Sequence, residues 1–254
     1  MNKLSVIMPA LNEEANIREA ATRVLKAFEA LGIDGEILVV NDGSTDKTQD
    51  IAQGLKGENP GKVFVIRHEK PQGIGASFWD GVDQARGDVV VMMPGDNEND
   101  PFESLRYFKL LADVDMIVPF PFNRENRSFL RNVVSSLFRF IINMTFCVNF
   151  NYTNGTILYR KSLLKQLSSR SYGFFYQADI LIRLVKQGYL FAEVPYRINT
   201  RKGGASKALS LKSFLNVAKG YLKLVKDYYF SFDRKSLSCG LCDDSQTRTR
   251  KGQR

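Results

Sequence analysis

An acidic loop, Met92–Pro101, holds the residues whose types are best suited to chemistry. It follows the apolar run Asp88–Val91 and contains Asp96 and Glu98 between asparagine, glycine and proline residues. Carboxylates that follow a buried strand offer hard oxygen ligands to a divalent cation, and a diphosphate would bind with that cation. The same residue types also form ordinary solvated turns. The rest of the chain must decide between a metal site and a turn.

Short apolar strands alternate with helical segments in the N-terminal part of the chain. Strands are expected at Leu4–Met8, Glu36–Val40, Val63–Ile66 and Asp88–Met93. Each of the first three is followed by a polar or glycine-rich loop and a helical pattern, such as the apolar spacing of Ile17, Ala20 and Val24. Strands without a solvated face belong in a parallel sheet. The pattern predicts an α/β fold with a mostly parallel sheet and helices on both faces.

The alternation continues with wider spacing after the acidic loop. The further expected elements are a helix from Phe102 to about Leu111, a strand at Met116–Pro119, a helix at Val133–Val148 interrupted by Arg139, a strand at Thr156–Tyr159, a helix at Gln177–Gln187, a strand at Leu190–Pro195 and a helix from Leu209 to about Phe230. The helix at Val133–Val148 fits either a membrane interface or ordinary packing. The predicted organisation is a domain at 1–208, an amphipathic helix at 209–232 and a basic, disordered tail at 233–254. The helix at 209–232 fits either a membrane surface or ordinary packing with a solvated lysine face.

The charge of the chain is concentrated near its C-terminus. The 254 residues contain 36 basic and 27 acidic side chains, of which 14 and 4 follow from Tyr196 onward. Such an excess suits nucleic acid, an anionic membrane surface or phosphorylated substrates. Nucleic acid is not expected, because no stacking or groove-reading motif appears. A cytoplasmic protein is expected, since no signal peptide precedes the first strand and no window reaches the ~18 to 20 apolar residues of a membrane span.

The three cysteines fit a reducing compartment. Cys239 and Cys242 have the spacing of a metal knuckle or redox pair, but the chain has no second such pair, and its single histidine is His68. Incidental cysteines in the tail are the favoured interpretation.

Four separated stretches carry a shared pattern. They are Pro9–Glu14, Val40–Asp46, the glycine-containing segment Gly73–Asp88, and Gly95–Asp96. Together they resemble the family 2 glycosyltransferases of GT-A fold, over roughly Leu4–Lys207. The resemblance implies a Rossmann-like domain that binds a nucleotide sugar at the carboxyl ends of its strands. The implied donor contacts are Pro9, Leu11, Glu13, Val40, Asp42, Gly95 and Asp96. The alternative is that Asp42 caps a helix and Glu13 suits the dipole of a first helical turn.

The resemblance also implies a metal site in the acidic loop. Asp96 matches the main ligand of a Mg²⁺ or Mn²⁺ ion, and Glu98 falls where dolichyl-phosphate mannosyltransferase-like members supply a glutamine. Pro94 stands where the family commonly has another aspartate. Mg²⁺ retains waters and needs only one or two protein carboxylates when phosphates complete its shell, so the loss need not abolish binding. Asp100 is interpreted as a turn residue and helix cap.

The second half is similar to the polyprenyl-phosphate sugar transferase branch of that family. Arg131–Ser135 looks like the acceptor loop of this branch, and Arg201–Lys207 looks like its Arg-x-x-Gly-x-Ser-Lys segment. The residues implied to hold the acceptor phosphate are Arg124, Arg127, Arg131, Ser135, Arg201, Ser206 and Lys207. Guanidinium groups match phosphate oxygens bidentately, so Arg131 and Arg201 join Asp96 as the catalytic candidates. A solvated basic loop is the alternative.

These residues predict an inverting glycosyltransferase that moves a sugar from a nucleotide-sugar donor to a polyprenyl phosphate. The protein is expected to bind peripherally to the cytoplasmic face of the membrane, and a membrane-protein partner is possible. An acceptor phosphate is already anionic and needs no general base. A saccharide hydroxyl acceptor would need a base, for which Asp179 is the candidate. The remaining alternative is a non-catalytic protein that binds a sugar nucleotide or a lipid.

Overall fold

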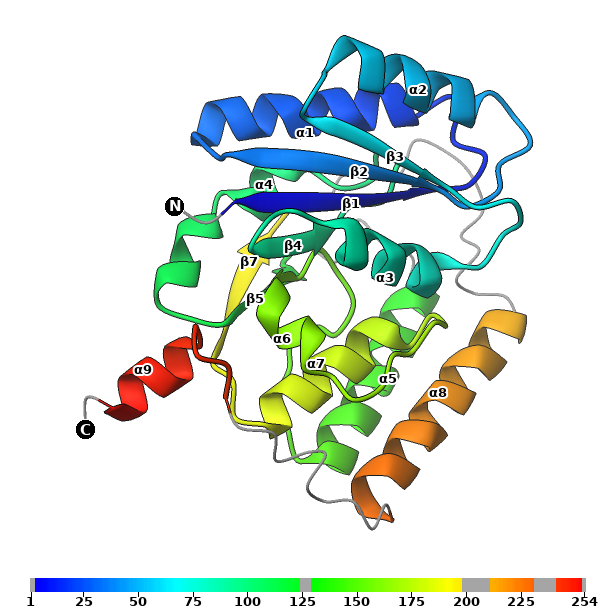
Figure 1. Ribbon diagram of the computed structural model, residues 1–254. Coiled ribbons are helices and arrows are strands. Elements are labelled where there is room, and N and C mark those ends of the chain that lie inside the picture. The colour runs from blue at the N-terminus through cyan, green and yellow to red at the C-terminus, as the bar shows by residue number, and fades with distance from the viewer. Residues whose placement is uncertain (1–2, 124–128, 198–210, 231–240, 253–254) are drawn as a thin grey trace. The chain divides into compact units, whose positions relative to one another are not determined.

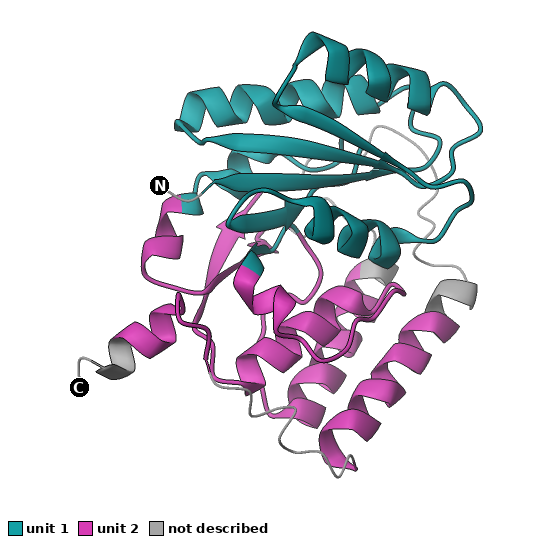
Figure 2. Cartoon of the chain, viewed as in Figure 1, with its two compact units in different colours: residues 1–108, 156–161 teal, residues 109–155, 162–254 magenta. Residues whose placement is uncertain are grey.

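A computed structural model of the chain describes residues 3–123, 129–197, 211–230 and 241–252 (Figure 1). These residues form two compact units (Figure 2). Unit 1 contains residues 1–108 and 156–161, and unit 2 contains residues 109–155 and 162–254, within the described ranges. The domain boundaries predicted at residues 208 and 232 lie outside the described residues and stay predictions.

Unit 1 is an α/β sheet with helices on both faces. Its strands are β1 (Leu4–Ala10), β2 (Gly35–Asn41), β3 (Val63–Arg67), β4 (Val89–Met92) and β6 (Leu158–Arg160), in the order β3-β2-β1-β4-β6. Its helices are α1 (Ile17–Leu31), α2 (Thr48–Glu58), α3 (Ile74–Gln84) and α4 (Pro101–Leu105). The strands β1 to β4 run parallel, whereas β6 is antiparallel to β4. Helices α1 and α2 lie on one side of the sheet and α3 on the other (Figure 1). The predicted mostly parallel α/β fold is confirmed.

The apolar pattern of the sequence explains these elements. Every residue of β1 and β2 is buried, as expected for strands covered on both faces. The apolar face of α1 that was predicted from its spacing is also buried, from Ile17 to Phe28. Gly32 ends this helix in the left-handed conformation, with a φ of 62°, which glycine adopts without a steric cost.

Helix α3 packs close to the sheet because it carries Gly81. A Cβ atom at this position would lie 2.4 Å from Cγ2 of Ile7 in β1, which is too close for any real contact. The glycine therefore allows the helix to cover the central strand directly. The large aromatic residues Phe78 and Trp79 of the same helix are fully buried beside it.

Unit 2 has two parallel strands and several helices. The strands are β5 (Met116–Pro121) and β7 (Phe191–Tyr196). The helices are α5 (Phe129–Phe146), α6 (Lys161–Lys165), whose first residue belongs to unit 1, α7 (Tyr176–Lys186), α8 (Leu211–Tyr229) and α9 (Gln246–Gly252), while the short 3₁₀ helix η1 (Phe108–Ala112) lies at the boundary between the units. Each helix and strand predicted after Pro101 is present, with the predicted helix at Phe102–Leu111 divided between α4 and η1.

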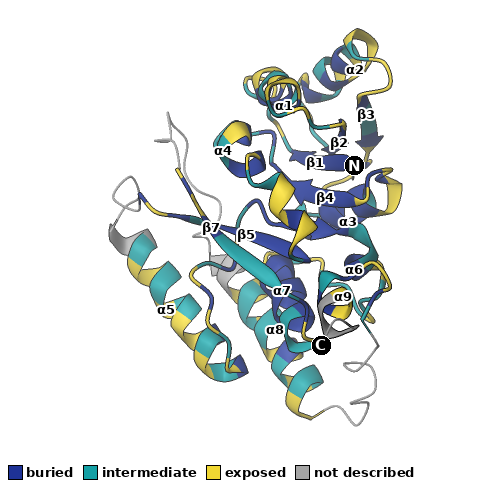
Figure 3. Ribbon diagram, turned by 90° about the vertical axis from the view of Figure 1, so that its left-hand side faces the viewer, coloured by how far each residue is buried: buried dark blue, intermediate teal, exposed yellow. Residues whose placement is uncertain are grey.

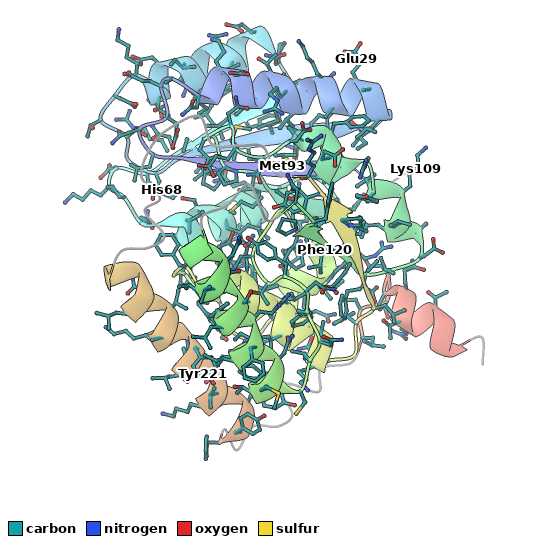
Figure 4. The ribbon with its side chains drawn as sticks, turned by 180° about the vertical axis from the view of Figure 1, so that it is seen from behind. Glu29, His68, Met93, Lys109, Phe120 and Tyr221 are labelled. Carbon is teal, nitrogen blue, oxygen red and sulfur yellow. The ribbon has the colours of Figure 1, made fainter. Side chains whose placement is uncertain are left out.

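Helix α8 packs on α5 and α7 within unit 2. The ring of Tyr221, labelled in Figure 4, lies edge-on to Phe146 of α5 and to Phe175 before α7. Gly220 allows the approach, since a Cβ atom there would be 2.7 Å from Cβ of Phe175. Leu224 of α8 is buried as well. One face of α8 is therefore part of the core of unit 2.

The prediction of a disordered tail at 233–254 is corrected for residues 241–252, which contain α9 and pack on unit 2, while the rest of the tail lies outside the described residues. The Asp115 carboxylate accepts hydrogen bonds from the Gln246 amide at 2.7 Å and from Oγ1 of Thr247 at 2.6 Å. Cys242 is buried, and its Sγ accepts a hydrogen bond from the hydroxyl of Tyr189. Burial raises the pKa of the Cys242 thiol. The polar composition suggested disorder, but a buried aspartate far away in the sequence supplies the acceptors that fold this segment.

Candidate functional site

The carboxyl ends of β1, β2 and β4 meet at one edge of the unit 1 sheet. Ala10 at the end of β1 pairs with Asn41 at the end of β2. Backbone hydrogen bonds extend the pairing into the loops: the Asp42 amide donates to the carbonyl of Ala10, and the Gly95 amide to that of Pro9, each at 2.9 Å. The predicted donor and metal residues therefore come together at this edge: Pro9, Leu11, Glu13, Val40, Asp42, Gly95, Asp96 and Glu98.

The loops that follow β1 and β2 are tied to each other by side chains. Five hydrogen bonds between side chains and backbone amides link them: Asn12 N to Ser44 Oγ, Thr45 N to Asn12 Oδ1, Glu13 N to Thr48 Oγ1, Glu14 N to Asp46 Oδ2, and Lys47 N to Glu14 Oε2. Asn12 has a φ of 57°, a conformation that asparagine tolerates better than most residues. Oδ1 of Asp46 accepts from the Thr48 amide at the start of α2. The two loops thus form one preorganised frame.

Glu13 uses one of its two carboxylate oxygens in a local hydrogen bond. Its Oε2 accepts a hydrogen bond from Nδ2 of Asn16 at 2.8 Å. Among the described residues, Oε1 has no hydrogen-bond partner, and the side chain is half-buried. A carboxylate oxygen in this position can accept a hydroxyl or N–H of a ligand.

The Asp42 carboxylate forms hydrogen bonds within the protein and still has room for a ligand. Its carboxylate is buried and accepts hydrogen bonds from the amides of Gln72 and Gly73, at 2.8 and 2.9 Å. Oδ1 also lies 2.8 Å from Nδ1 of His68. A carboxylate has about four acceptor positions, so one remains for a ligand N–H. Gly43 beside it has a φ of 75°. A Cβ atom at this position would lie 2.8 Å from the carbonyl carbon of Lys70.

His68 is a residue of the site that the sequence reasoning missed. It is buried between two carboxylates, with Nε2 3.0 Å from Oδ2 of Asp80, an ion-pair distance without hydrogen-bond geometry. In the tautomer that carries its proton on Nδ1, His68 donates a hydrogen bond to the Asp42 carboxylate. The available signal was that the only histidine of the chain follows β3 directly (Figure 4).

The acidic loop is ordered by its own ends and by α1. Asp100 is the N-cap of α4, and its Oδ1 accepts from the Glu103 amide at 3.2 Å, which confirms the predicted cap. Asn97 has a φ of 58°. Arg23 of α1 donates to Oδ1 of Asn97 at 2.8 Å and to Oδ2 of Asp100 at 3.0 Å.

The donor set of this loop fits a cation that arrives with a diphosphate. Asp96 Oδ1 accepts from the Glu98 amide at 3.1 Å, which places the two acidic residues on one tight turn. Across the part of the chain that the structure describes, no group of three His, Cys, Asp or Glu side chains could hold a metal ion. A cation at Asp96 and Glu98 therefore needs further oxygen ligands from phosphate and water, which is the usual habit of Mg²⁺.

The acceptor-phosphate residues belong to other parts of the chain. Arg124, Arg127, Arg201, Ser206 and Lys207 lie outside the described residues. Arg131 and Ser135 are in α5 of unit 2, where the structure describes the side chain of Ser135 as half-buried. The roles of all these residues stay predictions.

Asp179 is part of an ion-pair network inside unit 2. Its Oδ1 lies 3.1 Å from Nε of Arg183, whose Nη2 lies 2.7 Å from Oδ2 of Asp227 in α8. Burial raises the pKa of Asp179, although the Arg183 guanidinium opposes that shift. The carboxylate therefore links α7 to α8 through Arg183, a structural task that competes with the proposed task of a general base.

Every exposed side chain that the structure describes on α5 is apolar. Six of its side chains are 40 to 66% exposed: Val133, Val134, Leu137, Phe140, Ile141 and Met144. Arg139 is turned toward the following loop, where it donates to the carbonyl of Asn151 at 3.2 Å. The alternation of exposed and half-buried turns along α5 is visible in Figure 3. An exposed apolar stripe of this kind marks an interaction surface. No helix among the described residues is long and apolar enough to cross a membrane.

The geometry now defines a class of protein. A mostly parallel sheet with polar loops gathered at the carboxyl ends of its central strands is an arrangement that binds nucleotides. The pattern of glycosyl transferase family 2 matches residues 5–168, and the chain belongs to that family.

The relatives of this chain include transferases named for polyprenyl phosphates. It is 29% identical over 168 residues to the dodecaprenyl-phosphate galacturonate synthase of Rhizobium johnstonii, a match that covers 65% of this chain and 50% of the relative. It is 39% identical over 99 residues to the dolichol-phosphate mannosyltransferase of Pyrococcus furiosus, which covers 39% of this chain and 27% of the relative. The chain thus spans at most half the length of these relatives.

Solved structures share the fold. The glucosyl-3-phosphoglycerate synthase of Mycobacterium tuberculosis, in complex with UDP, superposes with a TM-score of 0.64 at 20% identity, over 89% of this chain and 79% of that chain. The same enzyme in complex with Mn²⁺, UDP-glucose and phosphoglyceric acid gives a TM-score of 0.62 at 20% identity, with the same coverage.

Proposed function

We propose that this protein is an inverting glycosyltransferase that moves a sugar from a nucleotide-sugar donor to a polyprenyl phosphate at the cytoplasmic face of a membrane. The observation that carries the proposal is the meeting of the Asp42 loop, the Glu13 loop and the Asp96–Glu98 turn at one sheet edge. Family membership supports the transfer chemistry, and the names of the relatives support the class of acceptor.

The preorganised frame would hold the nucleoside part of the donor. Asp42 has one acceptor position left for an N–H of the base, and Glu13 Oε1 can accept a ribose hydroxyl. The hydrogen bonds between the two loops hold these carboxylates before the donor arrives. Binding then costs little ordering of the chain.

Asp96 and Glu98 would hold a Mg²⁺ or Mn²⁺ ion. When bound, the ion supplies compensation for the charge of the leaving diphosphate. A solved neighbour of the same fold was crystallised with Mn²⁺ and UDP-glucose, which supports the choice of metal. Pro94 limits the protein ligands to these two carboxylates, so the donor itself must complete the binding site.

The acceptor would enter as a phosphate anion. Arg131, Arg201 and Lys207 are the predicted groups for its oxygens, with Arg124, Arg127, Ser135 and Ser206. The phosphate oxygen attacks the anomeric carbon from the face opposite the diphosphate, which inverts that centre. No base is needed because the nucleophile is already charged. The ion pair of Asp179 with Arg183 also argues against the hydroxyl acceptor for which Asp179 would be the base.

Contact with the membrane would be made by α5 more than by α8. The described exposed side chains of α5 are all apolar, whereas α8 buries Leu224 in unit 2 and exposes Lys219, Lys223 and Lys226 as well as Leu215 and Leu222. An apolar face suits insertion into the headgroup boundary, and lysines suit anionic headgroups. This division refines the prediction that residues 209–232 form the membrane-surface helix.

A transfer assay tests the function. Vesicles containing undecaprenyl or dolichyl phosphate are incubated with the protein, Mn²⁺ and a panel of UDP and GDP sugars, and lipid-linked sugar is measured. We expect product with at least one donor, and a loss of about a hundredfold or more in the Asp96→Asn variant, because a ligand of the charge-compensating ion is removed.

The control is Asp50→Asn, which changes an exposed carboxylate on α2 and should leave transfer unchanged. Full activity of Asp96→Asn would refute the metal role. Nucleotide binding by the wild type without product from any donor would favour the non-catalytic binding protein instead.

A further inference from the structure

Arg23 of α1 forms hydrogen bonds to the acidic loop. Its two terminal nitrogens donate to different residues, Nη1 to Oδ1 of Asn97 at 2.8 Å and Nη2 to Oδ2 of Asp100 at 3.0 Å. These two acceptors lie on either side of Glu98 in the sequence. A guanidinium group offers two fixed, roughly parallel N–H donors, which a lysine cannot reproduce.

The two hydrogen bonds from Arg23 to Asn97 and Asp100, here called the clamp, hold the middle of the acidic loop, because the other contacts hold its two ends. At one end the Gly95 amide bonds to β1, and at the other end Asp100 caps α4. Asn97, between them, has a left-handed backbone with a φ of 58°. Such a conformation is sparsely populated for residues other than glycine and persists when its surroundings hold it. The bond from Arg23 supplies that hold at the residue between Asp96 and Glu98.

We propose that Arg23 is a positioning residue that sets the separation of Asp96 and Glu98 for a divalent cation. The inference rests on the function proposed above. With Pro94 in place of a further carboxylate, the protein side of the site has two ligands within one turn, so their mutual geometry depends on the backbone at Asn97. A misplacement of about 1 Å in such a constellation is enough to cost large factors in activity.

Lys26 provides a matched control. It lines the same groove as Arg23, Asp100 and Phe102, one turn further along α1, and it is exposed. Among the described residues, Lys26 makes no hydrogen bond to the loop. Arg23→Met and Lys26→Met therefore remove the same charge from the same surface, but only the first removes the clamp.

The Asp100→Ser variant removes the contact with Arg23 but keeps the helix cap. A serine hydroxyl still accepts from the Glu103 amide and caps α4, but it gives up the ion pair with Arg23. If both residues act through one contact, the effects of Arg23→Met and Asp100→Ser will not add in the double variant.

Two measurements test the proposal in the full-length protein. The first is hydrogen exchange of amides 95–99 without any ligand, which should become at least about tenfold faster in Arg23→Met and stay unchanged in Lys26→Met. The second is Mn²⁺ affinity by electron paramagnetic resonance in the presence of UDP and, separately, GDP. We expect about tenfold weaker Mn²⁺ binding in Arg23→Met, an intermediate loss in Arg23→Lys, and no loss in Lys26→Met.

The outcomes separate the inference from the proposed function. Unchanged exchange in Arg23→Met would overturn the clamp, whatever the protein does. Faster exchange with unchanged Mn²⁺ affinity would overturn its role in positioning the ligands. A wild type that binds no Mn²⁺ with either nucleotide would overturn the proposed function and the role of Arg23 in it, while the exchange data would still measure the clamp.

Discussion

Unit 1 and unit 2 differ in the side chains at their surfaces and in the contacts that these side chains make. At the sheet edge of unit 1, polar side chains of neighbouring loops bond to one another and to backbone amides, and the apolar residues of the strands are buried. On α5 of unit 2, six apolar side chains between Val133 and Met144 are exposed, and Arg139 of the same helix bonds back to the protein. The polar loops of unit 1 therefore suit a polar ligand, whereas the exposed apolar surface of unit 2 suits an apolar partner.

The two units also use different tertiary contacts to hold their structure. Unit 1 uses electrostatic contacts at its surface to shape a site. Unit 2 uses a buried ion pair to hold α8 and exposes a row of apolar side chains on α5. The following changes test this contrast, and they run from the largest expected effect to the smallest.

The ion pair between α7 and α8 should give the largest effect. Arg183→Met would leave Asp179, which is 4% exposed, without its charged partner and would also release Asp227. Removal of one partner from a buried pair costs about 3 to 5 kcal/mol. We expect the free energy of unfolding in urea to fall by that amount.

The matched variant is Asp179→Asn, which keeps a polar group but removes the buried charge. The raised pKa of Asp179 means that the folded state disfavours its ionised form. The wild type should therefore lose stability relative to Asp179→Asn as the pH rises above the ordinary aspartate pKa of about 4. Equal stability of Arg183→Met and wild type would show that α8 is not held by this network.

The exposed face of α5 should give the next largest effect. Leu137→Ser together with Phe140→Ser removes two side chains that are 58 and 61% exposed, so folding should be little affected. Insertion of such side chains contributes about 1.5 kcal/mol or more each. We expect cosedimentation with anionic vesicles to fall about a hundredfold.

Leu110→Ser, in η1, is the control for that experiment because Leu110 is 38% exposed but lies outside α5. The same vesicle binding by all three proteins would refute α5 as the membrane contact. A fall with neutral vesicles as well as anionic ones would assign the effect to the apolar face rather than to the lysines of α8.

Substitution of His68 should reduce stability and ligand binding by a smaller amount, which depends on where the amide of the new side chain lies. The amide of His68→Asn can replace Nδ1 and keep the bond to Asp42, whereas the amide of His68→Gln reaches toward the position of Nε2. An acceptor left without its donor in a buried site costs about 1 to 2 kcal/mol. We expect His68→Gln to be less stable than His68→Asn and to show a smaller thermal shift with UDP or GDP. If the two variants behave alike, the bond to Asp42 has no part in the site.

The smallest effect is expected in the C-terminal segment. Thr247→Val removes the hydroxyl that donates to Asp115 and accepts from the Leu190 amide. Asp115 also accepts from that amide, so the loss should be about 1 kcal/mol, measured by urea unfolding. The exposed Arg248→Gln is the control. A chain whose stability does not change on Thr247→Val would not use this segment as part of unit 2.

Much of unit 1 could be predicted from the sequence. The strands and helices follow from apolar periodicity, which a local window records, and each was found close to its predicted bounds. The gathering of Glu13, Asp42 and Asp96 at one edge was implied by the family resemblance, and it agrees with the rule that the carboxyl ends of parallel strands lie together. The interpretation of Asp100 as a helix cap was confirmed as well.

Other features of the site could not be predicted in this way. Asp42 was expected to serve the nucleotide, and in the structure it also holds the segment before α3 together with His68. The tail was expected to be disordered because its composition is polar, yet Asp115 binds it. In both cases the partner lies far away in the sequence, so no local pattern carries the information.

The sequence by itself determined the elements and their order, the position of each carboxylate at a strand end, and the family of the chain. These properties depend on local periodicity and on short motifs. Tertiary structure alone decided that Arg23 clamps Asn97 and Asp100, that Arg183 joins α7 to α8, and that α5 turns its apolar face outward. A hydrogen bond or an exposed face depends on which distant segment arrives beside a residue, and that is a property of the packed chain.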